Sequence, residues 1–115
     1  MLNQSDPLDQ MFQALADPTR RRIVERLTRG TATVSELAEP FAMSLPAVVQ
    51  HLQVLEQSGL VTSKKVGRVR TCTIDTAALS QAEKWINDRR VGWEQRLDRL
   101  GAFLDALPDG ETPDK

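Results

Sequence analysis

Side chains that could bind another molecule gather on one face of a predicted helix over residues 44–58. With successive residues placed 100° apart, the core face holds Val48, Leu52 and Leu55, and the opposite face holds Pro46, Gln50, Gln53 and Gln57. An amide side chain carries a donor and an acceptor, and it can pair with adenine in the major groove of DNA. Leu45 and Val49 could contact thymine methyl groups. The alternative interpretation is an ordinary solvated helix surface.

The residues after this helix are predicted to form a β-hairpin that carries several basic side chains. Residues 60–65 and 69–74 are rich in Val, Thr and Ile, and they flank the turn sequence Val66-Gly67-Arg68. An arginine at the tip of such a hairpin could enter the minor groove beside a helix that reads the major groove. The alternative is a charged hairpin that resists pairing with other edges. The predicted DNA-binding residues are Ser44, Leu45, Pro46, Val49, Gln50, Gln53, Lys64, Lys65, Arg68 and Arg70.

The distribution of charge supports a local contact with phosphates. The net charge is −1, but segments 18–30 and 60–74 each carry a net charge of +4 inside an acidic chain. Two basic blocks form a local footprint and not a uniformly basic coat. In the first block, Arg20, Arg21, Arg22 and Arg26 are predicted to be structural, with some pairing to acids of the N-terminal segment or the long C-terminal helix. A phosphate contact by one of them is the alternative.

The elements that position these residues have a recognisable order. Helices are predicted over 8–16 and 18–29, and the spacing of Thr33 and Glu36 predicts a capping box at the start of a short helix that contains Pro40. Residues 42–44 are predicted to link this helix to the helix over 44–58, as in a helix-turn-helix. The hairpin and a long helix over about 77–107 follow. The fold class is therefore mainly α with a small β-hairpin, a winged helix-turn-helix with extra N- and C-terminal helices.

The long helix has an apolar residue at every seventh position. Leu79, Ile86, Trp93, Leu100 and Leu107 form this row, and Leu97 and Leu104 form a second row beside it. A heptad seam of this kind packs against a partner helix. The alternative is that these residues complete the core of their own domain. The core of a winged helix is already filled by residues such as Ile23, Leu37 and Leu55, so the extra stripe predicts a homodimer.

Length and composition exclude several classes of protein. The 115 residues suit a single domain, predicted over 1–107 with a frayed tail over 108–115. No apolar run approaches the ~20 residues of a membrane span, and no signal peptide is evident. One cysteine, Cys72, allows no internal disulfide, which predicts a cytoplasmic protein. Cys72 and His51 are both predicted to be structural. We find no catalytic motif, metal site or cofactor site, and the sequence predicts no enzyme.

Three segments together resemble one known family. QALADPTRRRIVERL (13–27), VSELAEPFAMSLPAVVQHLQVLEQSGLV (34–61) and GRVRTCTID (67–75) are similar to the ArsR-type winged-helix repressors in order and spacing. The resemblance implies a homodimeric bacterial repressor that binds a palindromic operator, with helix 44–58 in the major groove and the wing on the flanking groove. It also implies that the terminal helices form the dimer interface, through Leu8, Phe12, Leu79, Ile86, Trp93, Leu97, Leu100 and Leu104.

The sequence departs from the metal-sensing members of that family. Those members carry a cysteine pair in the first helix of the helix-turn-helix, whereas the matching stretch here, residues 36–41, has no cysteine. Others use histidine on the long C-terminal helix, which has none here. The resemblance thus implies a non-metal-sensing member whose operator and effector are unknown. Two alternatives stay open, which are a repressor with an unrecognised ligand or metal site and an adaptor that binds protein and not DNA.

Overall fold

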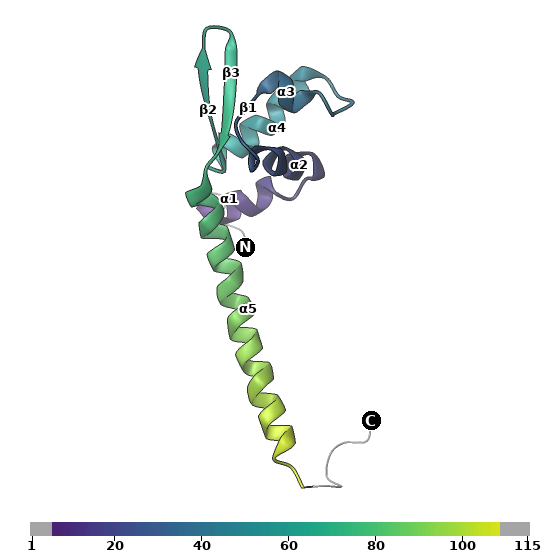
Figure 1. Cartoon of the computed structure of the whole chain (residues 1–115), viewed down its shortest axis with the longest axis vertical. Helices are drawn as coiled ribbons and strands as arrows, with labels where there is room; N and C mark the ends of the chain where they lie inside the picture. The colour runs from purple at the N-terminus through teal and green to yellow at the C-terminus, as the bar shows by residue number, and fades with distance from the viewer. Residues whose placement is uncertain (1–5, 109–115) are drawn as a thin grey trace. The chain divides into compact units, whose positions relative to one another are not determined.

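The computed structural model describes residues 6–108, and the chain divides into two compact units, one ending at Ala82 and the other beginning at Glu83. In chain order the elements are α1 (Pro7–Ala14), α2 (Pro18–Leu27), β1 (Ala32–Thr33), α3 (Val34–Ala38), α4 (Leu45–Gln57), β2 (Val61–Val66), β3 (Val69–Ile74) and α5 (Thr76–Asp105) (Figure 1). The predicted order of elements and the fold class are confirmed. The first unit holds the helix-turn-helix and the sheet, and α5 begins in it and continues through the second.

Each helix of the helix-turn-helix begins at the side chain that the sequence predicted. The hydroxyl of Thr33 accepts from the backbone N–H of Glu36 at 3.1 Å, and the carboxylate of Glu36 accepts from the N–H of Thr33 at 2.8 Å. The hydroxyl of Ser44 accepts from the N–H of Ala47 at 3.3 Å and so caps α4. These bonds satisfy N–H groups that have no partner within the helix. The starts of α3 and α4 are therefore fixed locally.

The strands form one antiparallel sheet in the order β1-β3-β2. In the hairpin, Val61 pairs with Ile74, Lys65 pairs with Arg70, and Val66 pairs with Val69. Gly67 has a φ of 62°, a left-handed conformation that glycine adopts without strain, and it closes the turn that the sequence predicted. The third strand, β1, was not predicted. It has two residues, with Ala32 opposite Cys72, and is too short to show a period in the sequence.

The core of the first unit is built by the apolar faces of its helices and the base of the hairpin. The largest fully buried side chains include Ile23, Leu27, Leu37, Leu55 and Leu60, and Val48 and Leu52 are also buried. The predicted core face of helix 44–58 is thereby confirmed. Cys72 is buried among them, and burial raises the pKa of its thiol. This supports a structural cysteine.

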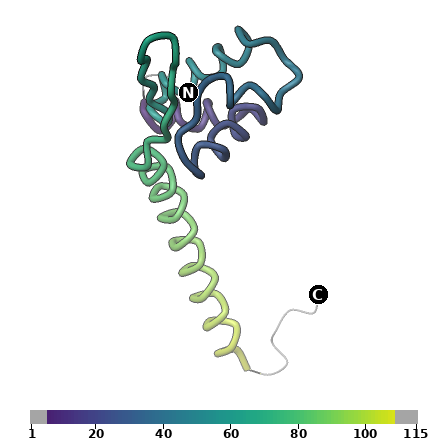
Figure 2. The backbone as a smooth tube through the Cα atoms, turned by 45° about the horizontal axis from the view of Figure 1, so that its top comes forward, coloured from purple at the N-terminus to yellow at the C-terminus, as the bar shows by residue number. Residues whose placement is uncertain are grey.

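Several boundaries differ from the sequence prediction. Both α1 and α2 end two residues earlier than expected, at Ala14 and Leu27. The short helix α3 ends at Ala38, so Pro40 lies outside it, because proline has no N–H for a helical bond and its ring clashes with the preceding turn. The link to α4 therefore covers residues 39–44 and not only 42–44 (Figure 2). Of the tail predicted over 108–115, residues 109–115 lie outside the described part of the chain.

Candidate nucleic-acid interface

The face of α4 opposite the core is exposed to solvent. Leu45, Pro46, Gln50, Gln53 and Gln57 are exposed, and Val49 is half-buried at the edge of this face. Burial of Val48, Leu52 and Leu55 fixes which side points outward. The amide groups of Gln50 and Gln53 are one helical turn apart and point to the same side. The arrangement offers two donor and acceptor pairs with apolar contacts beside them.

The wing, the hairpin of β2 and β3, presents its basic side chains to solvent. Lys64, Lys65, Arg68 and Arg70 are all exposed. Arg70 donates from Nε to the hydroxyl of Ser63 at 3.1 Å, and its Nη2 lies 3.9 Å from the Glu56 carboxylate near the end of α4. Within residues 6–108, Lys64, Lys65 and Arg68 have no hydrogen bond or ion pair from their side chains. Three cationic groups are thus available to an anion.

The wing is held next to α4 by a short connection. Ser58 ends the helix, and its hydroxyl donates to the carbonyl of Leu55 at 2.7 Å. Gly59 follows with a φ of 85°, which reverses the chain into Leu60 and β2. The Arg70–Glu56 contact crosses from β3 back to α4. The predicted DNA-binding residues of α4 and of the wing therefore belong to one compact unit.

Three of the arginines of segment 18–30 donate hydrogen bonds to backbone carbonyls, and Arg20 also lies close enough to Asp17 for its charge to lower the pKa of that carboxyl. Arg20 donates to the carbonyl of Ala14 at 2.6 Å, Arg21 to that of Leu15 at 2.8 Å, and Arg26 to that of Gly30 at 3.2 Å. Carbonyls at helix ends lack helical partners and attract such donors. Arg22 stacks on the ring of Phe41, with 4.8 Å to the ring centre. The prediction that these arginines are structural agrees with these contacts.

His51 lies on the inner side of α4 and is half-buried. Its Nδ1 is 3.3 Å from Nη1 of Arg20 and 3.8 Å from the carboxylate of Asp17. The predicted packed, hydrogen-bonded histidine is confirmed. The backbone N–H of Arg20, with smaller effects of the nearby His51 and Arg20 side chains, lowers the pKa of Asp17. The sequence did not show which residues His51 would contact, because they lie more than 30 positions away.

The second unit presents an apolar stripe along α5. Ile86, Trp93, Leu97, Leu100 and Leu104 are between 41% and 60% exposed. The aromatic residues Trp85 and Phe103, which the sequence analysis did not single out, are also exposed beside it. Of the other residues predicted for the interface, Leu8, Phe12 and Leu79 belong to the first unit and are half-buried. Leu79 packs against the core of the first unit, whereas the members of the heptad rows from Ile86 to Leu104 are exposed.

A cavity of about 680 Å³ lies between α2 and α3, and the sequence analysis did not find it. The chemical character of its wall is mixed, since it is lined by arginines, glutamates and one aromatic ring, among them Arg22, Arg26, Arg29, Glu36, Glu39 and Phe41. Its size is within the range of small-molecule sites. The spacing of Arg22, Arg26 and Arg29 along one helix face is the sequence signal that could have indicated it.

Two kinds of feature are absent from residues 6–108. In this range no group of three or more His, Cys, Asp or Glu side chains could hold a metal ion. No helix in the same range has the length and apolar composition needed to cross a bilayer.

Comparisons with known proteins agree with this geometry. The profile of a helix-turn-helix domain matches residues 15–64. The chain is 39% identical to the HTH-type transcriptional regulator Rv2034 of Mycobacterium tuberculosis over 97 residues, 81% of this chain and 91% of that protein. It is 30% identical to the transcriptional repressor SdpR of Bacillus subtilis, over 69% of this chain and 88% of that one. The crystal structure of an ArsR family transcriptional regulator is similar with a TM-score of 0.74 and 49% identity, covering 77% of this chain and 98% of that one.

Proposed function

The protein belongs to the ArsR family of winged helix-turn-helix transcriptional regulators, and we propose that it is a cytoplasmic homodimeric repressor that binds a palindromic operator. Its relatives are transcriptional regulators, and the chain is not an enzyme. The observation that carries the proposal is the exposed amide face of α4 beside a wing whose Lys64, Lys65 and Arg68 side chains are exposed and have no ion pair with any residue from 6 to 108. The amide face of α4 can bind base edges while the wing binds phosphates.

Each proposed contact follows from the chemistry of its side chain. Gln50 and Gln53 would bind base edges in the major groove, with Leu45 and Val49 against thymine methyl groups. Ser44 and Pro46 lie at the start of α4, where the helix would enter the groove. Lys64, Lys65, Arg68 and Arg70 would bind phosphates or a narrow minor groove.

The register of the wing supports an anionic partner. Lys65 and Arg70 are directly opposite each other in the hairpin. Like charges in this position repel each other and destabilise the pairing. The Glu56 carboxylate relieves only part of this repulsion, at 3.9 Å from Arg70. A phosphate group between the two side chains would relieve the rest, which favours binding of a polyanion over a passive charged surface.

The apolar stripe of α5 supports the homodimer. An exposed seam that contains Trp93, Leu97, Leu100 and Leu104 is unfavourable in water, and burial against an identical helix would remove it from solvent. A dimer with two-fold symmetry presents two reading helices related by that axis. Such a dimer binds two half-sites in inverted order, which is the reason to expect a palindrome.

The test of this function is selection of bound duplexes from a random pool. We expect an enriched palindromic sequence whose affinity falls steeply with salt, because cations on the wing displace counterions from phosphates. An enriched sequence without two-fold symmetry would contradict the dimeric binding mode. No binding to duplex DNA at low salt would contradict the whole proposal and favour the alternative of an adaptor that binds protein.

Stoichiometric zinc, cadmium or arsenite should leave the complex with the operator intact. The reason is chemical, since Cys72 is buried on β3 and His51 is half-buried on α4, and neither belongs to a group of three or more possible metal ligands among residues 6–108. Titration of the complex followed by fluorescence anisotropy measures this directly. A loss of DNA affinity that tracks one bound ion per chain would contradict the prediction and reveal a metal site.

The alternative of a repressor with a small-molecule effector has one structural observation in its favour. The cavity between α2 and α3 borders the first helix of the helix-turn-helix, so an occupant would contact the element that supports α4. Its arginines and glutamates suit a ligand that carries both a negative and a positive group. The ring of Phe41 adds a flat apolar surface.

A further inference from the structure

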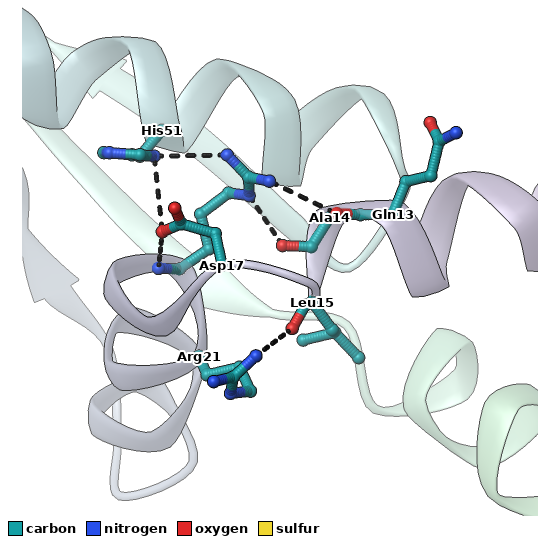
Figure 3. A network of polar contacts seen from close by, with 7 residues as sticks. Gln13, Ala14, Leu15, Asp17, Arg21 and His51 are labelled. Atoms are coloured by element: carbon teal, nitrogen blue, oxygen red, sulfur yellow. Dashed lines mark hydrogen bonds and ion pairs between the residues drawn. The ribbon is translucent and has the colours of Figure 1, made fainter.

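A polar network joins the end of α1, the start of α2 and the middle of α4 (Figure 3). Its centre is Arg20, whose guanidinium binds three partners at once. Nε donates to the carbonyl of Ala14 at 2.6 Å, Nη2 donates to the carbonyl of Gln13 at 3.2 Å, and Nη1 is 3.3 Å from Nδ1 of His51. All of these residues belong to the first unit of the chain.

The chemistry of arginine fixes the direction of its hydrogen bond with His51. A guanidinium has donors and no acceptor, so Nδ1 of His51 must accept the bond. Three bonds in three directions need the planar fork of arginine, and lysine would supply only a single point of attachment.

Asp17 holds the arginine in place. Its carboxylate accepts from the backbone N–H of Arg20 at 3.0 Å and caps α2. That bond is the largest cause of the lowered pKa of Asp17. Arg20 is thus held through its backbone as well as its side chain. The guanidinium that contacts His51 is therefore fixed in position.

His51 lies directly beside the proposed reading face. It follows Gln50 in the chain and precedes Gln53 by two residues. The rest of the inner face of α4 is apolar, through Val48, Leu52 and Leu55, and apolar packing has little directional preference. A hydrogen bond is directional. At the outer radius of a helix, a rotation of about 20° moves a side chain by about 2 Å, enough to break a bond to a base edge.

We propose that Arg20 and His51 are positioning residues for DNA recognition. By binding His51, Arg20 fixes the rotation of α4 about its axis relative to the end of α1, so that Gln50 and Gln53 meet base edges. Since α1 is also one of the helices proposed for the dimer interface, the same contact links that interface to the reading helix. The inference rests on the proposed function, and the structure supplies the contact that would carry it.

The test uses His51→Leu, Arg20→Lys and the double variant in the full chain. His51→Leu removes the acceptor, and Arg20→Lys keeps the charge but loses the fork. Each single variant should bind the selected operator about tenfold more weakly, while its affinity for a random duplex changes less than twofold. The double variant should be no weaker than either single variant, because both remove the same bond. His51→Gln, which retains an acceptor oxygen, should restore operator affinity to within threefold.

Measurements of Tm and circular dichroism separate positioning from folding. A positioning role leaves the unfolding transition of His51→Leu within a few degrees of the wild type. Equal losses on operator and random DNA, additive effects in the double variant, or no effect of His51→Leu on the operator would each overturn the positioning role. If the wild-type chain selects no operator, the proposed function itself fails, and this inference fails with it.

Discussion

A chain in which Leu100 and Leu104 are both replaced by glutamate should sediment as a monomer and lose operator binding. Both leucines are about half exposed in the single chain, and the proposed dimer would bury them. Burial of a fully exposed leucine side chain contributes about 1.5–3 kcal/mol, so burying the exposed half of four leucines in a dimer contributes about 3–6 kcal/mol. A dissociation constant of 1 μM corresponds to about 8 kcal/mol. The substitution removes a large part of that free energy, and the four glutamate side chains of the dimer would in addition lose solvation in the interface.

The matched control is Gln95→Glu with Ala102→Glu. These residues are exposed on the opposite side of α5 and receive the same added charge in the same helix. The control should remain dimeric in sedimentation equilibrium and bind the operator like the wild type. A wild-type chain that sediments as a monomer at micromolar concentration, or a leucine double variant that remains dimeric, would contradict the proposed interface.

The parts of the fold that the sequence predicts are those encoded by neighbours in the chain. The α4 helix is bounded by a hydroxyl cap at Ser44 and a glycine with positive φ at position 59, and its core face repeats at helical spacing. The hairpin follows from two β-rich runs around Gly67. The exposed reading face could be predicted for the same reason, since a buried face determines its opposite face.

The parts that the sequence does not predict depend on contacts between distant residues. Strand β1 is two residues long and exists because Ala32 meets Cys72 of β3. Arg20 and Arg21 of α2 bind carbonyls that become available only where α1 ends, near Ala14. The contact between Arg20 and His51 spans 31 positions. Composition and periodicity carry no signal for these pairings.

The two units pose different physical problems, and the proposed function would solve both. In the first unit the core is closed, and what faces outward is polar and cationic along α4 and the wing. In the second unit α5 has an apolar stripe and no core of its own. Without a polyanion the cationic side chains of the wing repel one another, and without a partner helix the apolar side chains of α5 stay exposed to water. The proposed dimer would supply the partner for the seam and also the symmetry for the charged surface.

Replacing Gln50 or Arg68 by alanine should weaken DNA binding in two different ways. Gln50 lies on the exposed face of α4, where an amide would pair with a base edge, so Gln50→Ala should cost about 1–3 kcal/mol on the operator and little on random DNA. Arg68 lies in the wing turn and has no partner within residues 6–108. Arg68→Ala should weaken binding to both kinds of DNA, with a salt dependence shallower by about one phosphate contact.

The two variants can be compared because neither should disturb the fold. Both side chains are exposed, and the positive φ in the wing turn belongs to Gly67 and not to Arg68, so alanine adds no strain there. Arg99→Ala, which removes an exposed arginine from α5, is the matched control for charge and should leave the salt dependence unchanged. Affinities for operator and random duplexes at several salt concentrations decide the matter. If Gln50→Ala lowered both affinities equally, α4 would not read sequence through this face, and its assignment as the recognition helix would be wrong.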